Sequence, residues 1–112
     1  MTSPITTHVL DTSLGKPAAG IAVALERQVG ALWSELGRGL TDADGRNRTL
    51  LSGELAAGVY RLTFATGPYF AAQKVAGFFP EVSIVFRVED GRSHYHVPLL
   101  LSPFGYSTYR GS

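Results

Sequence analysis

The chain has 112 residues, 45% hydrophobic and 17% charged, and this balance predicts one folded domain over residues 1–112 rather than disorder. The formal net charge of +1, with no basic run, argues against nucleic acid and anionic membrane surfaces as partners. Cysteine is absent, which excludes disulfides and thiolate metal sites.

The first half of the chain alternates short strand-like runs with turn-forming residues, which is the sequence pattern of a β-sandwich. The expected strands are residues 6–11, 21–28 and 32–39. Within the second, Ile21, Val23 and Leu25 recur at every other position, so we expect them to share one buried face. A polar turn, Asp-Ala-Asp-Gly at 42–45, then leads to Arg46.

The second half continues this pattern and is interrupted by one helix. Residues 67–75 begin with a Gly-Pro pair, contain alanines and precede Gly77, which predicts a single short helix. The expected strands around it are residues 59–66, 81–89, 94–101 and 104–109. The connections are short enough for antiparallel pairing. The predicted fold is therefore all-β: a two-sheet antiparallel β-sandwich with one short helix.

The strand expected at 94–101 has two unusual features. Pro98 lacks a backbone N–H, which predicts an edge, a bulge or an interface rather than a central ladder. Leucine occupies positions 99, 100 and 101, so both faces of the strand carry leucine, although one sandwich core takes only one face. We expect the other face to meet a partner surface, since large exposed apolar patches are rare on monomers.

Three histidines are candidates for chemistry: His8, His94 and His96. His94 and His96 are two residues apart and point to the same face of a strand. A metal site joining them to His8 is disfavoured, because no carboxylate or cysteine lies at an adjacent ligand spacing. His8 alone is more often a hydrogen-bonded structural residue, whereas His96, in a leucine-rich strand, needs a polar partner or a site. Arg46 after a turn is ordinarily a solvated residue. Taken together, these residues alone name no reaction.

The two ends of the chain bear on its location. No apolar leader follows Met1, and the longest apolar stretch, at 97–101, is far too short to cross a bilayer. The last residues, Tyr-Arg-Gly-Ser, are not a peroxisomal address. The expectation is a soluble cytoplasmic protein.

Two segments resemble the signatures of the transthyretin-related family. The first is THVLDTSLGKPA at 7–18, and the second is HYHVPLLLSPFGYSTYRGS at 94–112. Between them, Asp-Gly-Arg at 44–46 resembles the family's turn, and Phe-Pro-Glu-Val at 79–82 resembles the segment before its long strand. The resemblance covers essentially the whole chain in the right order, and its two terminal signatures are long and specific.

The family contains a hormone carrier, transthyretin, and an enzyme, 5-hydroxyisourate hydrolase, so the fold does not decide between them. The carrier has lysine, glutamate and threonine where this chain has His8, Arg46 and His96, and it lacks the terminal Tyr-Arg-Gly-Ser. The resemblance therefore implies the hydrolase, a cyclic amidohydrolase of purine metabolism that needs no cofactor and no metal. A transthyretin-like ligand carrier is the alternative, and an adhesion or carbohydrate-binding module is a weaker one.

The resemblance also implies roles for individual residues. His8, Arg46 and His96 are the expected catalytic residues, with either histidine as the base, and Tyr109 and Ser112 join His8 and Arg46 in binding substrate. The implied reaction opens the six-membered ring of 5-hydroxyisourate at its C6–N1 amide bond. The product, 2-oxo-4-hydroxy-4-carboxy-5-ureidoimidazoline, lies on the route of urate degradation to allantoin. The implied assembly is a homotetramer, a dimer of dimers, in which the C-terminus of one subunit completes a site on another.

Overall fold

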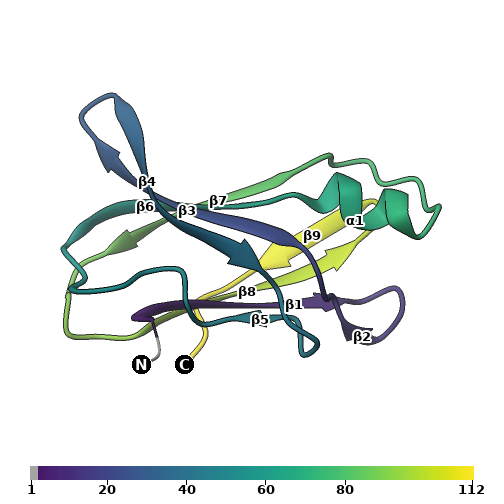
Figure 1. The fold of residues 1–112 in the computed structure, drawn as a ribbon, viewed down its shortest axis with the longest axis horizontal. Helices are drawn as coiled ribbons and strands as arrows, with labels where there is room; N and C mark the ends of the chain where they lie inside the picture. Colours follow the sequence, from purple (N-terminus) through teal and green to yellow (C-terminus); the bar gives the residue numbers. More distant parts are fainter. Residues whose placement is uncertain (1–2) are drawn as a thin grey trace.

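The computed structural model describes residues 3–112, so the first two residues of the expected domain lie outside the described range. Two packed sheets and one helix make up this range (Figure 1). The strands are β1 (Ile5–Asp11), β2 (Lys16–Pro17), β3 (Ala22–Val29), β4 (Leu32–Leu40), β5 (Arg46–Asn47), β6 (Gly58–Phe64), β7 (Val82–Val88), β8 (Tyr95–Ser102) and β9 (Gly105–Thr108), and the helix is α1 (Thr66–Ala72). The prediction of a two-sheet β-sandwich with one short helix is confirmed.

The first sheet runs in the order β2-β1-β8-β9, with the short β5 also paired to β1, and the second in the order β4-β3-β6-β7. One pair departs from the antiparallel expectation: β1 and β8 run parallel, from Ile5 opposite Tyr95 to Asp11 opposite Leu101. For this pair the expectation was wrong. A hairpin forces its two strands to be antiparallel, but β1 and β8 are separated by most of the chain, so no turn sets their direction.

The core lies between the two sheets and is built by alternation along each strand. The following inward-facing side chains are aliphatic or aromatic and at most 8% exposed: Ile21, Val23, Leu25, Tyr60, Leu62, Phe64, Val82, Ile84, Val97, Leu99 and Leu101. Burial of such a side chain stabilises the fold by about 1.5–3 kcal/mol. The buried face predicted for Ile21, Val23 and Leu25 is confirmed. Leu100, between two buried leucines, is only half-buried on the opposite face.

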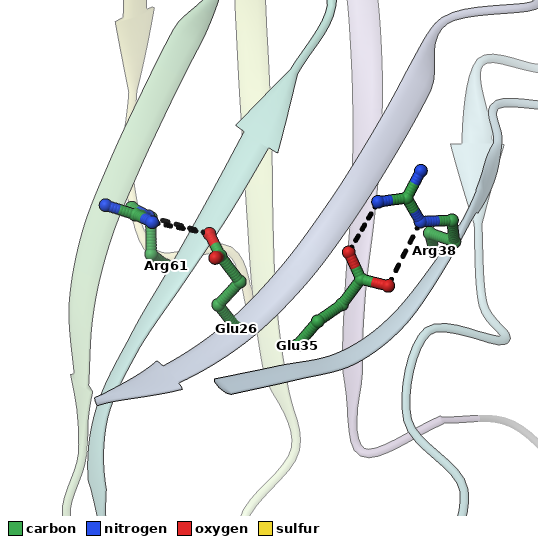
Figure 2. A network of polar contacts seen from close by, with 4 residues as sticks. All are labelled: Glu26, Glu35, Arg38 and Arg61. Carbon is green, nitrogen blue, oxygen red and sulfur yellow. Dashed lines mark hydrogen bonds and ion pairs between the residues drawn. The ribbon is translucent and has the colours of Figure 1, made fainter. Parts of the chain in front are cut away.

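The outer face of the second sheet carries charges that are paired with each other (Figure 2). Arg61 binds Glu26 across β6 and β3 at 2.8 Å, and its guanidinium lies 4.3 Å from the centre of the Trp33 ring. Arg38 binds Glu35 within β4 at 2.6 Å, and solvent screens this exposed pair. These contacts pair Glu26, Glu35, Arg38 and Arg61 locally.

The helix is shorter than the predicted 67–75 and ends at Ala72. Lys74 adopts a left-handed backbone conformation, with φ of 58°, which an α-helix does not allow.

Two side chains attach α1 to the rest of the fold. Phe70 packs into the core, and the Tyr69 hydroxyl donates a 2.7 Å hydrogen bond to Asp11 of β1. Burial alone raises the pKa of Asp11, but hydrogen bonds from Ser13, Tyr69 and Leu14 outweigh it and lower that pKa. Within the described range, no helix is long and apolar enough to cross a membrane.

Pro98 lies in β8, which is an interior strand of its sheet, between β1 and β9. The expectation that Pro98 excludes such a position is wrong for the strand as a whole. Pairing with β9 begins only at Leu99 opposite Thr108, so β8 has no continuous neighbour on that side at Pro98 itself. The Pro98 carbonyl accepts a 2.7 Å hydrogen bond from the Thr108 hydroxyl at this point.

Candidate active site

Arg46 is held opposite His8 by a turn that precedes β5. In this turn the Asp42 carboxylate accepts hydrogen bonds from the backbone N–H groups of Asp44, at 2.9 Å, and Arg46, at 3.0 Å. The N–H of Arg46 is the largest cause of the lowered pKa of Asp42. Gly45 has a φ of +76°, and its carbonyl accepts a 2.7 Å hydrogen bond from the N–H of Val9. The turn therefore fixes the register in which His8 and Arg46 are direct cross-strand partners.

His96 reaches the same face through the other neighbour of β1. In the parallel β1–β8 pair, Thr6 lies opposite His96. Thr6 and His8 are two residues apart on β1, so their side chains share a face. His8, Arg46 and His96, predicted from three separate segments, are thus brought to one face of the first sheet, the face opposite the core residues Ile5 and Val9.

The hydroxyl of Thr6 joins two histidines on this face. Thr6 is 4% exposed, and its Oγ1 lies 2.8 Å from Nδ1 of His96 and 2.9 Å from Nε2 of His94. The two rings have centroids 6.5 Å apart, so the prediction that His94 and His96 share a face is confirmed. Because Thr6 engages Nδ1 of His96, the other ring nitrogen, Nε2, is the one available to a bound molecule.

The surroundings of His96 favour its neutral ring. Burial is the main cause of its lowered pKa, followed by the positive charge of Arg46 and by His8, His94 and Arg48. A neutral imidazole is the form that accepts a proton from water. The ring that combines a fixed orientation with a lowered pKa is therefore His96.

The C-terminal residues return to His96 after β9 ends. The Gly111 N–H donates a 2.7 Å hydrogen bond to the His96 carbonyl, and the two residues form a β-bridge. A Cβ at position 111 would lie 2.5 Å from Cδ2 of the His96 ring, so only glycine fits without displacement. Ser112 follows directly and is exposed. The terminal Gly-Ser thus lies beside His96.

Tyr109 is not brought to His8, Arg46 and His96 in a single chain. Its side chain is 58% exposed and lines a hollow of about 290 Å³ with Ile84, Phe86 and Tyr95. The placement of Tyr109 in the substrate site therefore remains a prediction that depends on a second subunit.

Larger surface hollows lie elsewhere. One of about 460 Å³ is formed by β3, β4 and β6 and by Pro80 and Glu81, and none of the predicted site residues lines it. Between residues 3 and 112, no group of three or more His, Cys, Asp or Glu side chains is arranged to hold a metal ion. The candidate site itself presents imidazole, guanidinium and hydroxyl groups.

Four residues of this neighbourhood were given no role in the site from the sequence: Thr6, Arg48, Gly111 and, as a partner of His96, His94. The spacing of two between Thr6 and His8 was a usable signal, since it places both on one face. The pairing of Thr6 with His96 was not, because it depends on the register of two strands about 90 residues apart.

Comparison with known proteins identifies the family of this chain. The model of the HIUase/Transthyretin family matches residues 5–111. The 5-hydroxyisourate hydrolase of Salmonella dublin is 49% identical over 109 residues, which are 96% of this chain and 80% of that protein. The solved 5-hydroxyisourate hydrolase of Klebsiella pneumoniae is 42% identical with a TM-score of 0.86, over 96% of this chain and 98% of that one.

The carrier branch of the family is also close in structure. Sea bream transthyretin in complex with thyroxine is 33% identical to this chain and has a TM-score of 0.91, over 96% of this chain and 94% of that one. Hydrolase and carrier therefore share one backbone, and the side chains on its faces distinguish them. On the family match and on these identities, the chain belongs to the HIUase/Transthyretin family.

Proposed function

We propose that this chain is an enzyme that hydrolyses 5-hydroxyisourate to 2-oxo-4-hydroxy-4-carboxy-5-ureidoimidazoline in urate degradation. The observation that carries the proposal is the convergence of His8, Arg46 and His96 on one face of the first sheet. Relatives at 49% identity that carry the name of this hydrolase support it. The reaction is the cleavage of a cyclic amide by water and proceeds without a cofactor.

His96 is the proposed base. Water is a weak nucleophile, and removal of its proton as it attacks the carbonyl lowers the barrier. Nδ1 of His96 is engaged by Thr6, so Nε2 accepts the proton, and the lowered pKa keeps the ring neutral near neutral pH. The protonated nitrogen then supplies a proton to the leaving N1 nitrogen. His8 is the second proposed proton-transfer and binding group.

Arg46 is the proposed anion-stabilising residue. Negative charge grows on the carbonyl oxygen as water adds, and a fixed donor at that oxygen contributes strongly to the rate. The guanidinium keeps its charge and presents several N–H donors in a plane, which suits a flat, oxygen-rich substrate. Its cross-strand position opposite His8 supports a role for both groups on the same side of the substrate.

The proposed assembly is a homotetramer, and three features support it. The edge strands β7 and β9 each lack a neighbour on one side within the described sheets. Val85 on β7 is 58% exposed, and Leu100 lies half-covered on the face that carries the proposed site. Pairing of such edges and faces in two-fold symmetric copies covers them. In that assembly Tyr109 and Ser112 of one subunit contact the substrate bound to another subunit. The proposed location of the enzyme is the cytoplasm.

A ligand carrier is the alternative, favoured by the TM-score of 0.91 to a thyroxine-bound transthyretin. A carrier has no need for a half-buried, neutral imidazole beside an arginine, so the side chains favour the hydrolase. The deciding experiment adds purified protein to freshly prepared 5-hydroxyisourate and follows its ultraviolet decay against the spontaneous rate. Arg46→Ala serves as the matched variant and is expected to lose on the order of a hundredfold in kcat/KM. Decay at the spontaneous rate, together with tight thyroxine binding, would establish the carrier instead.

A further inference from the structure

We infer that Thr6 and His94 form a proton relay behind His96 and thereby set which nitrogen of His96 carries the proton. The inference rests on the proposed hydrolase function and adds two positioning residues to it. Its basis is the chain of three groups from His96 Nδ1 through Thr6 Oγ1 to His94 Nε2, joined by contacts of 2.8 and 2.9 Å.

The hydroxyl of Thr6 has a single proton, which couples the two rings. It donates to one ring nitrogen, so the other ring nitrogen must carry a proton and donate to it. Both rings cannot donate at once without leaving the hydroxyl proton unpaired, because no third partner of Thr6 Oγ1 occurs among residues 3–112. Thr6 is 4% exposed, so water does not readily supply that partner.

Only one of the two arrangements leaves His96 ready to act as a base. In it, Nδ1–H of His96 donates to Thr6, and the Thr6 hydroxyl donates to the bare Nε2 of His94. Nε2 of His96 is then bare and faces the substrate. In the reverse arrangement Nε2 of His96 carries a proton and acts only as an acid. His94 therefore determines the function of His96 through Thr6.

The relay also removes an electrostatic obstacle. Protonation of His96 alone creates an imidazolium in a half-buried position near Arg46, His8 and Arg48. His94 is exposed, so a positive charge on it is hydrated. Transfer along the chain moves the charge from the crowded ring to the hydrated one.

One proton moves across each link of the relay. As water attacks the carbonyl carbon, Nε2 of His96 takes one proton from the water. The Nδ1 proton of His96 passes to Oγ1 of Thr6, and the original Thr6 hydroxyl proton passes to Nε2 of His94. The hydroxyl is re-formed and His94 becomes the cation. When the C6–N1 bond breaks, the reverse transfer returns a proton to Nδ1, and Nε2 delivers its proton to N1.

Thr6→Val and Thr6→Ser test the hydroxyl. Valine has the shape of threonine without the hydroxyl, so we expect kcat to fall by on the order of 10- to 100-fold, within the range that proton-transfer groups contribute, with KM little changed. Serine keeps the hydroxyl and is expected to restore most of the rate. A merely structural role of Thr6 predicts instead that valine is tolerated or that both variants fall together.

His94→Ala tests the end of the relay, with Arg92→Ala as an exposed control two residues away. We expect His94→Ala to lose kcat and to recover part of it with added imidazole, which takes the vacated place. Thr6→Val is expected not to respond to imidazole, since the link itself is missing. Wild-type kcat in both Thr6→Val and His94→Ala would overturn the inference.

Ring ¹⁵N chemical shifts, measured on the full chain without substrate, separate this inference from the proposed function. In the wild type we expect His96 to carry its proton on Nδ1, and in Thr6→Val and His94→Ala to shift toward Nε2. An unchanged His96 tautomer in both variants would refute the coupling. If the wild type leaves 5-hydroxyisourate at its spontaneous rate, the hydrolase proposal fails, and the tautomer measurement alone decides whether the three groups are coupled.

Discussion

Replacing Gly111 by alanine is expected to displace the His96 ring while leaving the sandwich intact. The new Cβ would lie 2.5 Å from Cδ2 and 3.2 Å from Cγ of His96, whereas ordinary contacts begin at 3.4 Å. The shortfall, the difference between 3.4 and 2.5 Å, is 0.9 Å. A misplacement of about 1 Å in a catalytic group costs roughly a hundredfold in rate. We therefore expect kcat to fall by about that factor.

The control is Gly105→Ala in the same terminal segment. A Cβ at position 105 meets only the Ser102 hydroxyl, at an ordinary 3.7 Å, so this variant is expected to keep wild-type turnover. Both variants are compared by ultraviolet decay of 5-hydroxyisourate and by melting temperature. Unchanged turnover in Gly111→Ala, with its hydrogen bond to the His96 carbonyl retained, would refute the positioning argument. A large drop in melting temperature would also contradict it, since few core contacts are touched.

Three further predictions concern pH, stability and the tail. Turnover is expected to fall on the acid side below pH 6.5, because the pKa of His96 is lowered from that value. Arg46→Ala removes a nearby positive charge, so in this variant the acid limb should move up toward pH 6.5. Asp11→Asn is expected to lower the free energy of unfolding at neutral pH by about 1–3 kcal/mol in denaturant titrations. Since the pKa of Asp11 is lowered in the fold, the difference between variant and wild type should persist above pH 3.8 and vanish as the pH falls through the folded-state value. Deletion of residues 109–112 should leave a folded chain with little activity; full activity of the truncated protein, with an unchanged assembly in light scattering, would remove Tyr109 and Ser112 from the site.

Alternation of apolar residues was enough to predict the seven longer strands, but not the two-residue strands β2 and β5. Ile21, Val23 and Leu25 illustrate why: a period of two is imposed by the strand itself and needs no knowledge of neighbours. The helix was placed with an error of a few residues. Lys74 adopts a left-handed conformation, and nothing in the local sequence pattern indicates this for a lysine. Local rules thus recovered the elements and their inward faces.

The arrangement of the elements was harder to predict. The parallel pairing of β1 with β8 depends on contacts between the two ends of the chain, and short connections suggested antiparallel neighbours throughout. The same pairing sets Thr6 against His96, so the relay was invisible before the register was known. His8, Arg46 and His96 were selected through family resemblance, and their shared face follows from two strand registers that no local pattern specifies.

The parallel β1–β8 pair has a consequence for how the protein folds. The contacts of Thr6 with His94 and His96 span 88 and 90 positions of the chain. Contacts of such high sequence separation form slowly, because a long loop must close before they are made. During synthesis β1 emerges before β8, and the edge of β1 that pairs with β8 stays exposed until β8 is made. The face that carries His8, Arg46 and His96 is therefore completed only after β8 has been synthesised.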